Sequence, residues 1–236
     1  MSDLDWPDLP RLFPAFPDPG RWLPLLRAHA RLLDAASARV RVTTVTPREA
    51  IRRQYAESLE ILRIARLAGE PAEAADVGSG GGFPGLVFAA VDPAMPVHLV
   101  EPLQKRAALL REAALALGLD NVQVHAVRAE EAARGPLRDR CGMVTARAVA
   151  ELRELLEYTA PLATPGGTIV LPKGSARDAE VREAGAALAA LACEVEAVHP
   201  MRPEISDAIS VVVIRKIAHT PERYPRRAGM AKKRPL

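Results

Sequence analysis

A glycine-rich segment between residues 73 and 85 constrains the fold more than any other part of the sequence. It reads Glu-Ala-Ala-Asp-Val-Gly-Ser-Gly-Gly-Gly-Phe-Pro-Gly and holds five glycines within eight positions. Residues 74–77 predict a short buried strand, and Pro84 suits the first turn of a helix, where its missing N–H has no partner to lose. Glycine lets the backbone between them turn tightly and approach a ligand. The segment therefore predicts a strand–loop–helix unit that binds a ligand at the helix N-terminus.

Two ligand classes fit this loop. Gly80, Gly82 and Gly85 satisfy the G-x-G-x-x-G pattern of dinucleotide-binding folds, and Glu101 follows Gly80 by 21 residues. Asp76, however, comes two residues before the first glycine, where a carboxylate would repel a pyrophosphate. The same carboxylate suits S-adenosylmethionine (SAM), which carries a sulfonium and an ammonium group. We favour SAM as the cofactor, and a nicotinamide or flavin dinucleotide and a purely structural turn are the alternatives.

The composition describes an ordinary globular chain of the cytoplasm. Of 236 residues, 49% are hydrophobic and 26% are charged, no apolar run reaches about 18 residues, and the first residues lack a signal-peptide pattern. Two cysteines, Cys141 and Cys193, provide neither metal-ligand spacing nor a disulfide framework. The net charge is +3, and the last 14 residues hold six cations and no acid, which leaves 3 − 6 = −3 for the rest. The basic character belongs to the C-terminal tail.

Three regions follow from the order of the patterns. Residues 1–20 contain five prolines and predict an irregular arm. An apolar stripe that includes Trp22 and His29 predicts a helix from residue 21, with His29 a core histidine, and Thr46, Pro47 and Glu49 predict the capped start of a second helix. We therefore expect an N-terminal helical extension over residues 1–70, a core over residues 71–218 and a basic tail over residues 219–236.

Beyond the glycine loop, strands and helices alternate. Strands are expected at residues 97–101, 121–127, 141–146 and 167–171, which indicates a parallel sheet with ligands at the carboxyl ends of its strands. Residues 194–198 and 208–214 predict two further strands, and the roughly nine residues between them are too few for a helical crossover, so these strands should pair antiparallel. A seven-stranded Rossmann-like α/β sheet that ends in an antiparallel hairpin is typical of class I SAM-dependent methyltransferases.

Several polar residues follow the ends of the predicted strands. Glu101, expected to face solvent, could accept both hydroxyls of a ribose. The turn at 128–131 could contact an adenine, although acids also commonly begin helices. Arg147 follows the fourth strand, where it could lie at the mouth of the site or form a structural ion pair. Lys173 follows the fifth strand, where it could bind a phosphate or a carboxylate of the substrate.

The chemistry of the acceptor is limited by what the sequence lacks. There is no Asn/Asp-Pro-Pro-aromatic motif after the fourth strand, and neither cysteine is well placed as the nucleophile that methylation of a ring carbon needs. An acceptor with a free lone pair, such as a ring nitrogen, requires only alignment and exclusion of water. No residue is predicted to act as a catalyst beyond positioning, with Arg147 and Lys173 as candidates near the acceptor.

The chain resembles a known family, the bacterial small-subunit ribosomal RNA guanine-N7 methyltransferase G, also called glucose-inhibited division protein B. The resemblance covers about residues 40–236 and is carried by the segments 76–85, 105–106, 128–131, 146–148, 173–174, 224–229 and 233–236. It implies transfer of a methyl group from SAM to N7 of one guanine in 16S rRNA, with naked rRNA or the 30S subunit as partner. The chain departs from the family pattern at Arg41, Gln54 and Glu57.

The resemblance also implies roles for individual residues. Gly78 and Phe83 would lie at the methionine and adenosine parts of SAM, Ala129 and Glu130 at the adenine, and Arg147 in the cofactor pocket. With the residues argued from the loop and the strand ends, the expected cofactor-binding set is Asp76, Gly78, Gly80, Gly82, Phe83, Glu101, Ala129, Glu130 and Arg147.

The tail has two interpretations. Its cations could bind rRNA phosphates, or the tail could pack on the core through Tyr224, Pro225 and Pro235. The expected RNA-binding residues are Arg223, Arg226, Arg227, Lys232, Lys233 and Arg234. We expect a monomer without metal or membrane attachment. The alternative functions are methylation of a small molecule and a non-catalytic RNA-binding factor in ribosome assembly.

Overall fold

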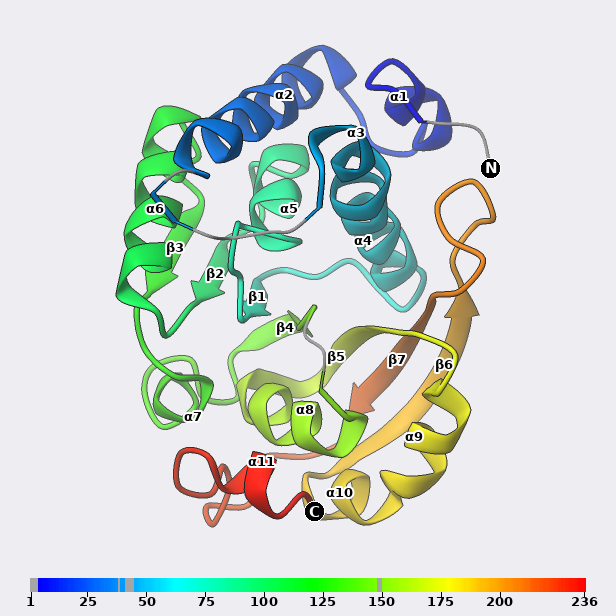
Figure 1. Cartoon of the computed structure of the whole chain (residues 1–236). Coiled ribbons are helices and arrows are strands. Elements are labelled where there is room, and N and C mark those ends of the chain that lie inside the picture. Colours follow the sequence, from blue (N-terminus) through cyan, green and yellow to red (C-terminus); the bar gives the residue numbers. More distant parts are fainter. Residues whose placement is uncertain (1–3, 38, 41–44, 148–149) are drawn as a thin grey trace.

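A computed structural model describes residues 4–37, 39–40, 45–147 and 150–236. Its centre is a sheet in the order β3-β2-β1-β4-β5-β7-β6 (Figure 1). The first five strands run parallel, and β7 is antiparallel to both β5 and β6. The predicted Rossmann-like sheet with a terminal antiparallel hairpin is therefore confirmed. The strands are β1 Ala74–Val77, β2 Val97–Val100, β3 Val122–His125, β4 Cys141–Thr145, β5 Ala163–Lys173, β6 Cys193–Pro200 and β7 Ser210–Lys216.

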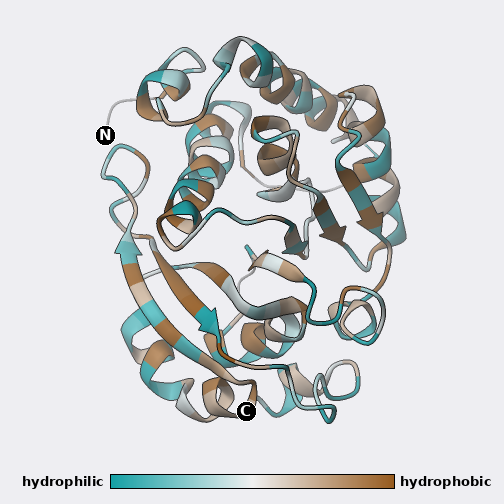
Figure 2. Ribbon diagram, turned by 180° about the vertical axis from the view of Figure 1, so that it is seen from behind, coloured by the Kyte–Doolittle hydropathy of each residue, from teal (hydrophilic) through white to brown (hydrophobic). Residues whose placement is uncertain are grey.

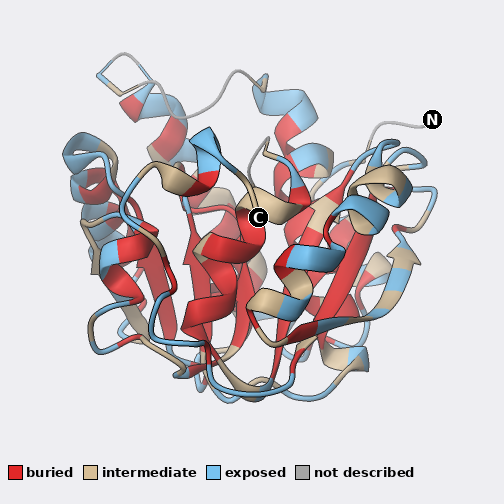
Figure 3. Cartoon of the chain, turned by 90° about the horizontal axis from the view of Figure 1, so that it is seen from below, coloured by how far each residue is buried: buried red, intermediate tan, exposed pale blue. Residues whose placement is uncertain are grey.

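Helices cover both faces of this sheet, and Figure 3 shows the buried residues concentrated in the strands and in the helix faces turned toward them. The central strands are apolar on both faces: Ala74 packs in one core cluster and Ala75 in the other. One layer contains α1 Asp8–Leu12, α2 Pro19–Ala36, α3 Pro47–Ala50, α4 Glu57–Leu67, α5 Gly85–Val91 and α6 Gln104–Ala116. The other contains α7 Ala129–Ala132, α8 Leu152–Thr159, α9 Arg177–Glu183, α10 Gly185–Ala190 and α11 Met230–Lys233.

The outermost strand, β6, has one wet face. Its residues alternate between more and less exposed positions, and Figure 2 shows the matching alternation of hydropathy. Such alternation is expected of an antiparallel strand that packs on one face only.

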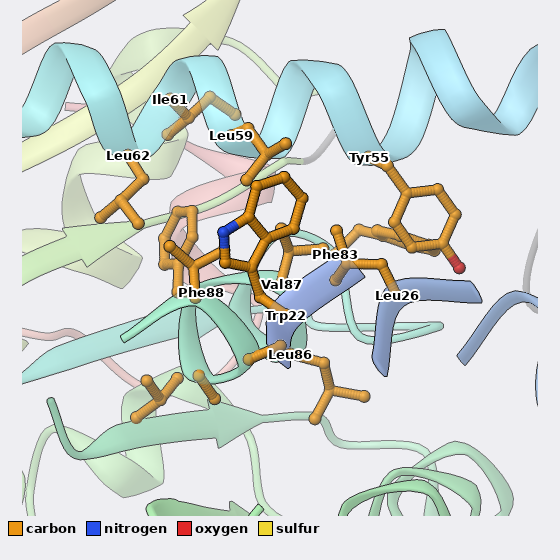
Figure 4. Close-up of a cluster of buried hydrophobic side chains, with 14 of the residues drawn as sticks. Trp22, Leu26, Tyr55, Leu59, Ile61, Leu62, Phe83, Leu86, Val87 and Phe88 are labelled. Atoms are coloured by element: carbon orange, nitrogen blue, oxygen red, sulfur yellow. The ribbon is translucent and has the colours of Figure 1, made fainter. Parts of the chain in front are cut away.

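The N-terminal helices share a core with the sheet. Trp22 from α2 is fully buried between α4 and α5, where Leu59, Leu62 and Phe88 surround it (Figure 4). The prediction of an irregular arm is wrong, because residues 8–12 form α1 and Leu9, Phe13 and Phe16 are buried. Sequence reasoning gave too much weight to the prolines, which at positions 7 and 19 mark the starts of helices, where a missing N–H costs little.

The second predicted helix begins as expected. Thr46 accepts a hydrogen bond from the Glu49 backbone, and the Glu49 side chain accepts one in return, which completes the capping box. The helix then widens into a π-helical turn, η1 Ile51–Ala56, before α4 continues it. Such turns are rare and frequent at functional sites. Gln54 and Glu57 of this region are buried, whereas Arg41 lies outside the described residues.

The C-terminal tail is attached to the core. The buried carboxylate of Glu157 in α8 accepts from the Arg226 guanidinium at 2.5 to 3.0 Å and from its backbone N–H at 2.8 Å. Arg134 and Arg138 donate to the carbonyls of Pro225 and Tyr224 at 2.8 and 2.9 Å. The packing interpretation is thus correct for Tyr224 and Pro225, which are buried, and Arg226, expected to bind RNA, is paired with Glu157. The other five tail cations are exposed: Arg223, Arg227, Lys232, Lys233 and Arg234.

Candidate functional site

The glycine loop joins β1 to α5 in a conformation that needs its glycines. Gly82 has a φ of +94°, and a Cβ there would overlap the Leu86 side chain. A Cβ on Gly85 would overlap Leu99 and lie 2.9 Å from the carboxylate of Asp76. Position 85 thus requires glycine because Leu99 and Asp76 approach its backbone closely, and not because the chain turns there. Pro84 forms the N-cap of α5, one residue earlier than predicted.

Asp76 is the central charge of this loop. It is fully buried, and its Oδ2 accepts a hydrogen bond from the Gly85 backbone N–H at 3.0 Å. Its Oδ1 has no hydrogen-bond partner among the described residues. Burial raises the pKa of this carboxyl to about 6, against which the Gly85 hydrogen bond and the Arg147 charge act. A cationic ligand would supply the partner that Oδ1 lacks.

Glu101 is buried rather than solvent-facing, so that expectation is wrong. Its two carboxylate oxygens accept from the backbone N–H groups of Gly80 and Leu103, each at 2.9 Å. Each oxygen keeps a second lone pair. The residue also lines a pocket of about 580 Å³ with Gly78 and Arg128. Glu101 therefore fixes the loop and presents acceptors to this pocket at the same time.

The turn after β3 forms another wall of the pocket. Arg128 and Glu131 line it, as do Leu103, Gln104 and Arg106 after β2. The sequence predicted a ligand contact for the 128–131 turn, whereas Arg106 was noted only within a segment that carries the family resemblance. Ala129 and Glu130 begin α7, so their N–H groups have no helical acceptor. The Glu130 carboxylate accepts a hydrogen bond from the backbone N–H of Gly229 in the tail at 3.0 Å.

The other end of the glycine loop packs against the N-terminal helices. The Phe83 ring lies 5.0 Å from the Tyr55 ring and 5.1 Å from the His29 ring, centroid to centroid. His29 Nε2 donates to the Gly81 carbonyl at 2.9 Å, and the Tyr55 hydroxyl donates to His29 Nδ1 at 3.2 Å. Burial lowers the pKa of His29 to about 4, so the ring is neutral in this role. The predicted core histidine is confirmed, and it holds the loop, which the sequence did not reveal.

Arg147 follows β4 beside the same aromatic cluster. Its guanidinium carbon lies 5.4 Å from the centre of the Phe83 ring, and its Nη1 donates to the Arg53 carbonyl at 2.9 Å. The same Nη1 lies 3.6 Å from Glu57 Oε2. The structure thus brings Arg147 together with the cofactor loop and with the π-helical turn.

Lys173 is held in a structural ion pair, which the sequence did not predict. Its buried ammonium donates to the Ala150 carbonyl at 2.5 Å and to Glu180 at 2.7 Å, and Glu180 also accepts from the Leu152 backbone at 2.8 Å. Lys173 thereby holds the segment that leads into α8. In this arrangement its charge is already neutralised by Glu180.

Neither cysteine offers a thiolate. Both are buried, and burial raises the pKa of Cys141 to about 12 and that of Cys193 to about 11. Within the described ranges, no group of three or more His, Cys, Asp or Glu residues could hold a metal ion. No helix in those ranges is long and apolar enough to cross a membrane.

The site fits SAM better than a dinucleotide. The buried Asp76 carboxylate has one unpaired oxygen for a cationic group, whereas a pyrophosphate beside it would be repelled. Glu101 presents acceptors to the neighbouring pocket. Together with the terminal hairpin, these features define a SAM-dependent methyltransferase.

Comparison with known proteins gives the same class and a family. Residues 23–207 match the GidB family, described as rRNA small subunit methyltransferase G. The protein of that name from Roseiflexus castenholzii is 42% identical over 86% of this chain and 87% of its own length. The one from Chloroflexus aggregans is 42% identical over 84% and 83%. The chain belongs to this family.

Solved structures agree at the level of the fold. TYW2 from M. jannaschii in complex with AdoMet superposes with a TM-score of 0.56 at 16% identity, over 77% of this chain and 80% of that one. A SAM-dependent methyltransferase from Aquifex aeolicus gives a TM-score of 0.54 at 17% identity, over 72% and 93%.

The double role of Glu101 leads to a test. In Glu101→Gln, one acceptor oxygen becomes an NH2 group, so either Gly80 or Leu103 loses its partner and the ribose loses a charged acceptor. SAM affinity measured by calorimetry should fall roughly 10- to 100-fold, and the free energy of unfolding without ligand should fall by about 1–3 kcal/mol. The exposed Glu194→Gln is the matched control and should change neither. If the variant is less stable but binds SAM normally, Glu101 only stabilises the loop and does not bind the ribose.

Proposed function

We propose that this protein transfers the methyl group of SAM to N7 of one guanine in 16S rRNA. The observation that carries the proposal is the intact cofactor site of a chain that belongs to the rRNA small subunit methyltransferase G family. Relatives at 39% to 42% identity, which carry the same name, support the choice of ribosomal RNA as the substrate.

The chain's own residues provide binding and alignment. SAM, when bound, supplies an electrophilic methyl group on a positively charged sulfur. Asp76 offers its unpaired Oδ1 to the cationic part of this ligand, and Glu101 holds the ribose in the pocket that it lines with Gly78. The expected contacts of Gly78, Gly80, Gly82, Phe83, Ala129, Glu130 and Arg147 with SAM belong to the same proposal.

Transfer to a ring nitrogen requires no proton removal before attack, because guanine N7 has a free lone pair at neutral pH. This agrees with the high pKa of both thiols, which argues against covalent catalysis on a ring carbon. The protein therefore accelerates the reaction chiefly by alignment and by exclusion of water. Arg147 is placed for this beside Phe83, whereas the ion pair of Lys173 favours a structural role.

We further propose that the enzyme acts as a monomer in the cytoplasm without a metal ion, on 16S rRNA or on the 30S subunit. Five exposed cations of the tail, Arg223, Arg227, Lys232, Lys233 and Arg234, would contact phosphates. Arg226 is excluded from this set because Glu157 already binds it.

Charge removal separates the two roles of the tail. Replacing Arg227, Lys232 and Lys233 by glutamine should flatten the salt dependence of rRNA binding, by up to about 0.9 log units per lost phosphate contact. Stability should stay within about 0.5 kcal/mol. Arg226→Ala leaves Glu157 buried and unpaired and should cost about 2–3 kcal/mol, less than for a fully buried pair, because Arg226 is partly exposed. An unchanged salt slope in the triple variant would show that Arg227, Lys232 and Lys233 do not contact phosphates.

Methyl transfer itself tests the proposal. Purified protein and methyl-labelled SAM are incubated with 16S rRNA, naked or assembled into 30S subunits, from cells that lack the gene. Borohydride reduction followed by aniline cleaves RNA at 7-methylguanine, so one new cleavage site is expected. Label in a small molecule instead of RNA would support the first alternative function. RNA binding without any label transfer would support the assembly factor.

A further inference from the structure

Glu57 is a buried carboxylate that takes no part in the proposed binding of SAM. Glu57, the first residue of α4, is 8% exposed and directly follows the π-helical turn. Within the described part of the chain, its oxygens accept no hydrogen bond, and the nearest guanidinium nitrogen, on Arg147, lies at 3.6 Å. Burial raises the pKa of Glu57 to about 7, against the opposing charges of Arg147, Arg53 and Arg52. The side chain is nevertheless 10% exposed, so the donors of a ligand can reach its oxygens and replace water there.

Glu57 lies beside the cofactor loop, to which Arg147 connects it. Arg147 lies between Glu57 and the Phe83 ring of the cofactor loop, at 3.6 and 5.4 Å. Neither Glu57 nor Arg147 lines the pocket that Glu101 shares with Glu131, as far as the described residues show. The pair therefore lies beside the loop but apart from the proposed ribose pocket.

The chemistry of this pair matches one edge of guanine. Guanine presents two donors, N1–H and the 2-amino group, next to one acceptor, O6. Adenine presents a lone pair at N1 instead, which a carboxylate would repel. A carboxylate beside a guanidinium is complementary to the first pattern and not to the second.

We propose that Glu57 and Arg147 recognise the target base, with the Glu57 carboxylate accepting from N1–H and the 2-amino group and Arg147 donating to O6. The inference rests on the proposed function and names the residues that select guanine. It leaves N7, on the opposite side of O6 from N1, free to face the methyl group.

The same pairing favours the reaction. The N7 lone pair forms the new N–C bond while the bond between sulfur and the methyl carbon breaks, and its electron pair remains on sulfur. The positive charge thus passes from sulfur to the guanine ring, and N1–H becomes a stronger donor. The anionic Glu57 interacts more strongly with that cationic ring than with neutral guanine, so it stabilises the transition state more than the ground state.

The test pairs changes in the protein with a change in the base. Subunits are assembled on 16S rRNA with guanine or inosine at the methylated position, and inosine differs only by lacking the 2-amino group. Single-turnover methylation by the wild-type protein should be roughly 10- to 100-fold faster on guanine, as loss of a hydrogen bond to a charged group requires. The ratio should fall below about 5-fold in Glu57→Gln and approach about 1 in Glu57→Ala.

The guanine-to-inosine rate ratio of each variant is compared with that of the wild-type protein, which cancels any intrinsic difference in N7 reactivity between the two bases. Melting temperatures and SAM affinity identify variants that fold and bind the cofactor, and Glu57→Gln keeps the size of the side chain should Glu57→Ala fail to fold. The exposed Glu49→Gln, two turns earlier, should keep the wild-type ratio. If the wild-type protein is active and a folded Glu57 variant keeps the wild-type ratio of guanine to inosine methylation, the proposed contact between Glu57 and the base is wrong. This holds even if the variant binds SAM more weakly. A wild type that methylates neither subunit would overturn the proposed function, and the pairing with it.

Discussion

The hydrogen bond between Asp76 and the backbone of Gly85 is the contact on which the site depends. It buries a carboxylate at the end of β1 and ties it to the start of α5, across the glycine loop. Any side chain at position 85 would collide with Asp76 or Leu99, so the bond requires glycine. The arrangement leaves one oxygen without a partner, and this makes the loop selective for a cation.

The N-terminal helices contribute residues that contact the glycine loop. His29 and Tyr55 hold the loop through the Gly81 carbonyl and the Phe83 ring. The helix that carries Tyr55 contains a π-helical turn, and Glu57 follows that turn directly. The cofactor loop and Glu57, proposed to recognise the base, therefore pack against the same hydrophobic core, in which Trp22 is fully buried.

The sequence predicted what depends on local patterns. The glycine spacing, the capping box at Thr46 and the short link between β6 and β7 each report local geometry, and each prediction is confirmed. The sequence could not reveal which charges pair over long distances. Tertiary packing determines the ion pair of Lys173 with Glu180, the ion pair of Arg226 with Glu157, and the two hydrogen bonds that Glu101 accepts from the backbone. For the same reason Glu57 was recorded only as a departure from the family pattern, although its burial makes it a candidate for recognition of the base.

Proton release on SAM binding tests the central claim most directly. With a pKa of about 6, Asp76 is about half protonated at pH 6 in the free protein, and pairing with a cation requires the ionised form. Calorimetry in buffers of different ionisation enthalpy should show about half a proton released by Asp76 per SAM near pH 6, and this Asp76-dependent release should disappear as the pH rises well above 6. Asp76→Asn should release fewer protons near pH 6, and NAD should not bind. Binding of SAM without this Asp76-dependent release, or binding of NAD in its place, would contradict the account.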